Sequence, residues 1–170
     1  TIHDIILHHY PNGANTFKQS LYKILLRFTL LRAKHIVTVS HTTENELLTA
    51  FPFIQKKISV VYPGVSTIFR PVSNEQAANV RQKYALPESF LLYVGNTKEH
   101  KNVPMLLEAY TKAELQNTDL VLITDRVHQL QLPKGCRVLS GIDLSDLPAI
   151  YSSASGLTTA TLAEGFGLPV

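Results

Sequence analysis

The last residues of the chain, 163–170, combine a carboxylate with two closely spaced glycines in the order AEGFGLPV. They follow residues 156–160, an apolar run that predicts a short buried strand, so we expect a helix to begin here. Ligands of open α/β sheets bind beyond the carboxyl ends of strands, where helix N-termini present unpaired N–H groups to anions. Gly165 and Gly167 would let the backbone approach a phosphate, and Glu164 could accept hydrogen bonds from sugar hydroxyls. Taken alone, however, a Gly-x-Gly sequence more often only caps a turn.

A second polar stretch, residues 95–102 (GNTKEHKN), joins the continuous apolar run at residues 90–94 to an expected helix. Gly95 directly follows the predicted strand. Lys98 and Lys101 would place fixed positive charge beside the free amides of the helix N-terminus, which is the chemistry of a diphosphate site. From the residues alone, this interpretation and that of an ordinary surface loop carry equal weight.

Near the start of the chain, His3 and Asp4 interrupt the apolar residues 2–7. This pattern predicts a strand end from which polar side chains leave the core, a position typical of active sites. His8 and His9 follow closely, and three nearby histidines suggest a metal site. Because no carboxylate or cysteine stands at a helical i, i+4 spacing, we expect no metal. His3 could also simply form a hydrogen bond within a loop.

The composition excludes several classes of protein. Sixteen Lys and Arg against thirteen Asp and Glu give a net charge of +3, which is too mild and too scattered to indicate a nucleic-acid partner. It leaves room for a modest basic face that contacts anionic lipid or a diphosphate. The single cysteine, Cys136, excludes an internal disulfide and fits a reducing compartment. With no spanning apolar run and no signal peptide, we expect a cytoplasmic protein that can associate with a membrane.

The remaining pattern alternates helices with strands. Helices are expected at about 16–33, 43–50, 74–84, from 103, and 146–153, and strands at 35–40, 58–62, 90–94, 119–124 and 136–140. Ser40 or Thr43 could cap the second helix and Asn102 the fourth. The alternation indicates the α/β class, with Rossmann-like parallel sheets and flanking helices. Pro63-Gly64 and Pro71 punctuate the pattern as a hinge does, so we expect two domains, residues 1–66 and 67–170.

The first long helix has apolar residues at helical spacing: Phe17, Leu21, Ile24, Leu25, Phe28 and Leu31. Its polar positions include Lys18, Lys23, Arg27 and Arg32. This basic face could lie on a membrane, although a solvated face of a core helix is the more common explanation.

Four separated segments of the chain, taken in order, resemble the motifs of one known family. They are TIHDIILHHYP from residue 1, VYPGV with the following FRP at residues 61–71, YVG with the following KN at residues 93–102, and EGFGLP at residues 164–169. In this order they resemble the retaining glycosyltransferases of family 4, which have the two-domain GT-B fold. The resemblance covers essentially the whole chain.

The resemblance implies roles for individual residues. His3 would lie close to the transferred sugar, Glu164 would orient the donor sugar, and Lys101 would hold the donor diphosphate. The other donor-binding residues would be Gly95, Asn96, Lys98, Gly165, Phe166, Gly167 and Leu168. Many members have an arginine where Asn96 and Thr97 stand, so Lys98 is the candidate substitute.

The chain also departs from the family pattern. Asp125-Arg126 stand where members usually have a glycine, and Ala160-Thr161 where they commonly have Pro-Ser. The second glutamate of the family motif, eight positions after the first, would fall just past Val170. Because the chain also begins inside a strand-like segment without a methionine, we expect a fragment truncated at both ends.

By resemblance, the expected activity is transfer of a hexose from a nucleoside diphosphate sugar to a glycan or lipid-linked acceptor, with retention and without a cofactor. Likeness to the mannosyltransferases of polysaccharide biosynthesis favours mannose from GDP-mannose. The alternative is an inactive fragment that only binds nucleotides or self-associates, since uncovered apolar faces would favour a homo-oligomer. An unrelated Rossmann enzyme lacks support, because no Gly-x-Gly-x-x-Gly follows the first strand.

Overall fold

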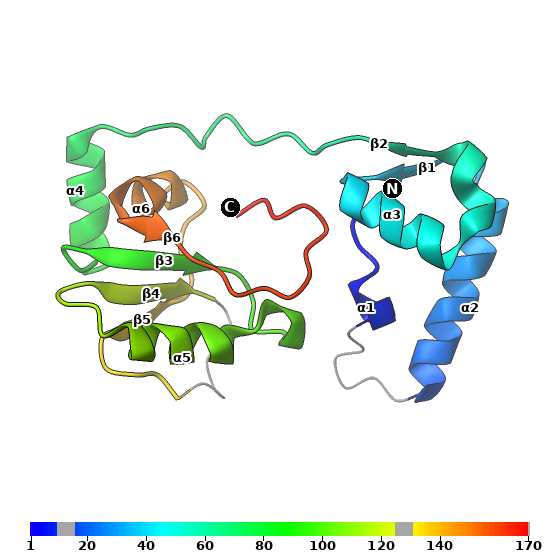
Figure 1. Cartoon of the computed structure of the whole chain (residues 1–170). Coiled ribbons are helices and arrows are strands. Elements are labelled where there is room, and N and C mark those ends of the chain that lie inside the picture. The colour runs from blue at the N-terminus through cyan, green and yellow to red at the C-terminus, as the bar shows by residue number, and fades with distance from the viewer. Residues whose placement is uncertain (10–15, 125–130, 170) are drawn as a thin grey trace. The chain divides into compact units, whose positions relative to one another are not determined.

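The computed structural model describes residues 1–9, 16–124 and 131–169 (Figure 1). The chain folds into two compact units. Unit 1 comprises Thr1–Gly64 and Ala163–Leu168, and unit 2 comprises Val65–Leu162 together with Pro169. Each unit has its own apolar core. The predicted domain division, residues 1–66 and 67–170, stays a prediction. The Asp125-Arg126 departure lies outside the described residues.

Unit 1 is built on a small parallel sheet. Strands β1 (Ile36–Thr38) and β2 (Ile58–Val60) pair with Ile36 opposite Ile58. The helices are α1 (Ile6–His9), α2 (Thr16–Arg32), α3 (His41–Ala50) and the 3-10 helix η1 (Pro52–Lys57). Because α3 and η1 connect the two parallel strands, they form the crossover of a βαβ unit.

The start of the chain joins this sheet and then leaves it. Ile2 makes a single parallel bridge to Thr38, and its N–H donates to Val37 O at 2.8 Å. His3 and Asp4 are exposed, as expected of polar residues at a strand end. Beyond them the chain turns into α1, because Asp4 Oδ1 accepts a hydrogen bond from Ile6 N at 3.0 Å and so provides the acceptor that starts a helical turn.

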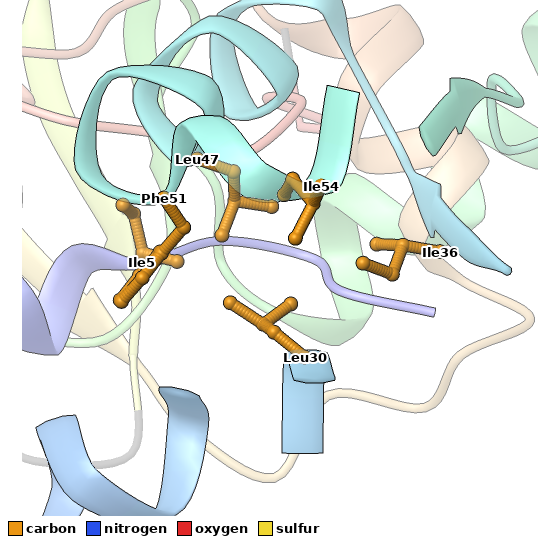
Figure 2. Close-up of a cluster of buried hydrophobic side chains, with 6 residues drawn as sticks. All are labelled: Ile5, Leu30, Ile36, Leu47, Phe51 and Ile54. Carbon is orange, nitrogen blue, oxygen red and sulfur yellow. The ribbon is translucent and has the colours of Figure 1, made fainter. Parts of the chain in front are cut away.

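Six buried apolar side chains form the core of unit 1: Ile5, Leu30, Ile36, Leu47, Phe51 and Ile54. Figure 2 shows them converging from the first residues, the end of α2, β1, α3 and η1. None is more than 6% exposed. Full burial of such a side chain stabilises the fold by about 1.5–3 kcal/mol, so this cluster holds the elements of unit 1 together.

Helix α2 contacts this core through a different stripe from the one its sequence suggests. Leu30 is buried and Leu26 packs partly against the cluster. The residues at predicted helical spacing are instead between 44% and 72% exposed: Phe17, Leu21, Ile24, Leu25, Phe28 and Leu31. We call these six residues the exposed stripe. The sequence could not distinguish the two stripes because both are apolar and both recur every three or four residues.

Unit 2 contains a four-stranded parallel sheet in the order β5-β4-β3-β6. The strands are β3 (Phe90–Val94), β4 (Asp119–Ile123), β5 (Cys136–Leu139) and β6 (Gly156–Leu157). The helices are α4 (Asn74–Lys83), α5 (Val103–Ala113) and α6 (Leu147–Ser153), with the 3-10 helix η2 (Glu99–Lys101) ahead of α5. This architecture confirms the predicted α/β class with parallel sheets and flanking helices.

Both faces of this sheet are covered, which explains its continuous apolar strands. Phe90 and Leu92 of β3 point to a cluster that includes Val80 of α4 and Ile150 of α6. Tyr93 faces the other side, where the cluster includes Leu106 and Leu107 of α5. The alternation follows from the two-residue period of a strand.

The only cysteine of the chain, Cys136, begins β5 and packs partly against the α5 side of the sheet. Burial, together with the neighbouring Asp119 carboxylate, raises the pKa of its thiol to about 11. At neutral pH the side chain is therefore an uncharged thiol that packs as a small apolar group.

Candidate functional site

The loop at residues 95–102 leaves the carboxyl edge of the unit 2 sheet, as predicted. Gly95 N donates to Ile123 O at 3.1 Å, which continues the pairing of β3 with β4. A Cβ on Gly95 would lie 2.9 Å from Tyr93 Oη, and that hydroxyl donates to Asn96 O at 2.7 Å. A side chain at position 95 would therefore displace the Tyr93 hydroxyl and disturb its hydrogen bond to the loop, which glycine avoids.

Two local hydrogen bonds shape the rest of this loop. Asn96 Oδ1 accepts from Lys98 N at 3.1 Å, and Lys101 N donates to Lys98 O at 2.9 Å within η2. Asn102 follows in the left-handed region with φ 51°, and its side chain makes no capping hydrogen bond. Asn102 is therefore the N-cap residue of α5, as predicted, but it acts through the left-handed turn of its backbone between η2 and α5 and not through its side chain.

The lysines of this loop differ in their surroundings. Lys98 is exposed and Lys101 is half-buried at the end of η2, one residue before the Asn102 turn. The first N–H groups of α5 have no carbonyl partner within the helix. Two cations and a helix N-terminus therefore follow one another along the carboxyl edge of the sheet, an arrangement suited to an anion.

Two hydrogen bonds to one backbone carbonyl join this loop to the stretch that precedes Glu164. His100, which is buried, accepts hydrogen bonds at its carbonyl from Leu162 N at 2.7 Å and from Thr161 Oγ1 at 3.1 Å. Thr161 is one of the two residues at which the chain departs from the Pro-Ser of the family, and its hydroxyl is used here. Sequence reasoning missed His100, since its part in the loop is played by a backbone carbonyl.

Residues 163–169 contain no helix, so the helix predicted after the last strand does not begin before residue 170. Ala163–Leu168 pack as an irregular segment of unit 1, with Gly167 at φ 81°. Glu164 is half-buried, whereas Phe166 and Leu168 are exposed. Long-range contacts within unit 1 replace the helical hydrogen bonds here.

The predicted site residues of unit 1 meet at their backbones. A Cβ on Gly165 would overlap the carbonyl oxygen of His3 and lie 3.3 Å from Asp4 Cβ. The segment that carries Glu164 therefore approaches His3 so closely that only glycine at position 165 permits it. The ring of Phe166 lies 5.8 Å from that of Tyr62, between centroids.

The structure therefore places the predicted residues in two groups. Gly95, Asn96, Lys98 and Lys101 belong to unit 2, and His3 and Glu164 to Leu168 belong to unit 1. Among the residues that the structure describes, no group of three or more His, Cys, Asp or Glu side chains could hold a metal ion. In the same residues, no helix is long and apolar enough to cross a membrane.

Two family models match successive parts of the chain. The model of "Glycosyltransferase Family 4" matches residues 1–69, and the model of "Glycosyl transferases group 1" matches residues 76–170. The O-antigen chain mannosyltransferase RfbU of Salmonella typhimurium is 27% identical over 99% of this chain and 47% of its own length. The O-antigen chain mannosyltransferase B of Escherichia coli is 28% identical over 100% of this chain and 48% of its own.

Solved structures show the same fold. Anabaena HepE, in a complex with UDP and glucose, matches with a TM-score of 0.79 at 16% identity and covers 99% of this chain and 48% of that one. Sucrose-phosphate synthase of Thermosynechococcus elongatus matches with a TM-score of 0.70 at 22% identity, over 92% and 42%. The chain thus spans about half the length of the curated relatives it matches. Because the second family model matches more than half of the chain, this protein belongs to the glycosyl transferases of group 1.

Proposed function

We propose that this chain binds a nucleoside diphosphate sugar and takes part in the transfer of its hexose to a glycan or lipid-linked acceptor, with retention of the anomeric configuration. The observation that carries the proposal is the loop at residues 95–102. It brings two lysines and the N-terminus of α5 to the carboxyl edge of a parallel sheet. Ligands of such sheets bind at this edge.

The chemistry of the proposal needs no metal. As the bond between sugar and diphosphate breaks, negative charge develops on the leaving diphosphate. Lys101 and the first amides of α5 would stabilise this charge, and Lys98 would supply the second cation. Glu164 would accept hydrogen bonds from the sugar hydroxyls, and His3 would face the transferred sugar.

The names of the relatives support mannose as the transferred sugar. The two curated relatives described above are mannosyltransferases of O-antigen chains, which makes GDP-mannose the first donor to test. The HepE structure contains UDP and glucose, so UDP and UDP-glucose are the natural competing ligands.

Thermal unfolding with GDP, UDP, ADP and their sugars tests the donor site. A ligand at one hundred times its dissociation constant stabilises the folded chain by about 2.7 kcal/mol. We expect one base to give this shift and Lys101→Ala to abolish it. Lys112→Ala is the control, because Lys112 lies on helix α5 but near its end, where it pairs with Glu108 on the surface. Equal loss in both variants, or no shift with any nucleotide, would contradict the proposal.

A second candidate function is binding or self-association without turnover. The exposed stripe of α2 favours it, since six large apolar side chains exposed on one helix are typical of a surface that contacts a partner. Release of free or transferred sugar from the stabilising donor distinguishes the two candidates. Binding without any sugar release, with every acceptor tried, would favour the second.

A further inference from the structure

Two hydroxyl side chains at the start of α3 contact the backbone of both halves of the unit 1 site. Ser40 Oγ donates to Gly165 O at 2.5 Å. Thr43 Oγ1 lies 3.3 Å from His3 O and 3.4 Å from Gly165 O. Neither residue carries charge, and no catalytic motif marks them in the sequence. Their position between His3 and the Glu164 segment is what distinguishes them.

Ser40 does more than cap the helix. Its Oγ accepts a hydrogen bond from Thr43 N at 3.1 Å, which is the capping interaction. Its single proton remains to be donated. Gly165 O at 2.5 Å is closer than Thr43 Oγ1 at 3.2 Å, so the proton goes to the carbonyl of Gly165.

Thr43 has no capping role for its side chain. Its hydroxyl is buried, with the residue 1% exposed, and lies within hydrogen-bond distance of the carbonyls of His3 and Gly165 as well as of Ser40 Oγ. Because Ser40 donates its own proton to Gly165 O and a buried hydroxyl without a partner is costly, the single proton of Thr43 is donated to these two carbonyls, to one of them or shared between both. A carbonyl oxygen has two lone pairs, and Gly165 O can therefore accept from both hydroxyls.

The surrounding backbone leaves little room for other arrangements. Gly165 approaches His3 so closely that any Cβ would overlap the His3 carbonyl. Asp4 Oδ1 holds Ile6 N and thereby fixes the turn that follows His3. Ser40 and Thr43 thus hold two short segments whose side chains, Glu164 and His3, are those assigned to the donor sugar.

We propose that Ser40 and Thr43 are positioning residues that fasten the Glu164–Gly165 backbone beside His3 and so set the geometry for the donor sugar. This inference rests on the proposed function. It assigns the two hydroxyls to the sugar and not to the diphosphate, because the site residues that they contact, His3 and Gly165, belong to the unit 1 group. Their loss should therefore reduce the affinity that the sugar adds to the nucleotide.

Three substitutions separate positioning from capping. Thr43→Val keeps the shape and leaves the Ser40 cap intact, but removes the donated proton. Ser40→Asp keeps a good cap acceptor and likewise has no proton to donate at neutral pH. Thr43→Ser retains a hydroxyl and should restore wild-type behaviour. Ser73→Ala is the control for loss of a cap alone, because Ser73 caps α4 in unit 2.

The measurement is the dissociation constants of GDP and GDP-mannose, and of UDP and UDP-glucose, by calorimetry on the full chain. For the pair that the wild-type chain binds, we expect Thr43→Val and Ser40→Asp to weaken the sugar nucleotide by roughly fivefold to tenfold, the loss of about one hydrogen bond. Affinity for the diphosphate alone should stay within about twofold. Hydrogen exchange of residues 161–168, without ligand, should become faster in both variants.

Each result decides between the two proposals. If the wild-type chain gains no affinity from the sugar of either donor, the proposed function fails and this inference fails with it. If the wild-type chain gains affinity and Thr43→Val retains the whole gain, the positioning role alone is overturned. Parallel loss of diphosphate and sugar-nucleotide affinity, without rescue by Thr43→Ser, would also overturn it, because that pattern indicates general loosening of the fold.

Discussion

At the scale of single residues, one compact cluster of charged side chains in unit 2 lies between two helices. Lys83 at the end of α4 donates to Asp143 at 2.8 Å and to Asp146 at 2.7 Å, and Tyr84 Oη also donates to Asp146 at 2.7 Å. Asp146 is the N-cap residue of α6. The hydrogen bond from Lys83, and then that from Tyr84, lowers the pKa of the Asp146 carboxyl. The cluster therefore links the end of one helix to the start of the other.

This lowered pKa predicts a pH dependence. A carboxyl whose pKa is lower in the folded state stabilises the fold above its unfolded value of about 3.9, and the contribution is lost as the pH falls through the folded value. We expect Asp146→Asn to lower the free energy of unfolding at pH 7, and the difference from wild type to shrink below about pH 4. Urea unfolding at several pH values measures this.

The matched control is Glu108→Gln, which removes an exposed pair with Lys112 on α5. Because both partners are exposed, its effect at pH 7 should be at most about 0.5 kcal/mol. A constant effect of Asp146→Asn from pH 7 to pH 3 would show that the carboxylate charge contributes nothing at this position.

Single residues also show which parts of the candidate site can be predicted from the sequence. Gly95 and Lys101 were predicted as anion-site residues because a glycine and a lysine lie between a strand and a helix and because the segment resembles the family's diphosphate loop, and this assignment stays a prediction. Ser40 and Thr43 carried only a local signal, that of a helix cap. Their long-range role depends on Gly165, 125 residues away from Ser40, and no local pattern predicts such a contact.

At the scale of elements, the end of α2 is held by a lysine from another element. Lys57 Nζ donates to Leu30 O at 2.7 Å, Ala33 O at 2.9 Å and Leu31 O at 3.1 Å. These are carbonyls of the last helical turn and the residue after it, which lack partners within the helix. A cation here also interacts favourably with the negative end of the helix dipole.

We expect Lys57→Met to reduce the free energy of unfolding of unit 1 by about 1–3 kcal/mol, because the substitution leaves these carbonyls without their donor while keeping much of the side-chain bulk. Lys56→Met is the control, since Lys56 is the exposed neighbour on η1 and should change stability by less than about 0.5 kcal/mol. Chemical unfolding of both variants compares them. Equal changes in the free energy of unfolding would mean that the hydrogen bonds from Lys57 to the carbonyls do not stabilise unit 1.

Helices and strands were largely predictable from the sequence where an element is buried on all sides. The apolar runs of β3 and β4 lie in the middle of a sheet covered on both faces, so their composition alone reveals them. Helix α2 was predicted as a helix, but its core-facing side was not, because Leu26 and Leu30 are no more apolar than the exposed stripe. The irregular course of Ala163–Leu168 depends on contacts with α3 and His3, which lie far away in the sequence.

At the scale of the whole molecule, the exposed stripe is the surface most suited to contact with a partner. Helix α2 contains four basic residues and no acidic one. Apolar side chains with flanking cations suit either a second copy of the chain or an anionic lipid surface. We expect Phe28→Glu to reduce association of either kind, because it places a charge in the middle of the stripe.

Sedimentation over a range of protein concentrations, and flotation with vesicles that contain or lack anionic lipid, distinguish the two partners. Thr29→Glu is the control, because it adds the same charge at the next exposed position but outside the stripe. We expect Thr29→Glu to retain most of the association. A wild-type chain that stays monomeric and leaves both kinds of vesicle unbound would show that the stripe has neither partner.

The half-buried thiol of Cys136 can serve as a reporter of motion in unit 2, through the rate at which thiol reagents modify it. It is the only sulfhydryl of the chain, and it belongs to unit 2 alone. Since its pKa is raised to about 11, reagents that require the thiolate will modify it slowly while the sheet is closed. A change in the rate of modification therefore reports a change in the exposure of the thiol at the start of β5. A nucleotide that binds at the carboxyl edge of the same sheet and stabilises unit 2 would lower the rate of modification of Cys136, even where no change in shape can be detected.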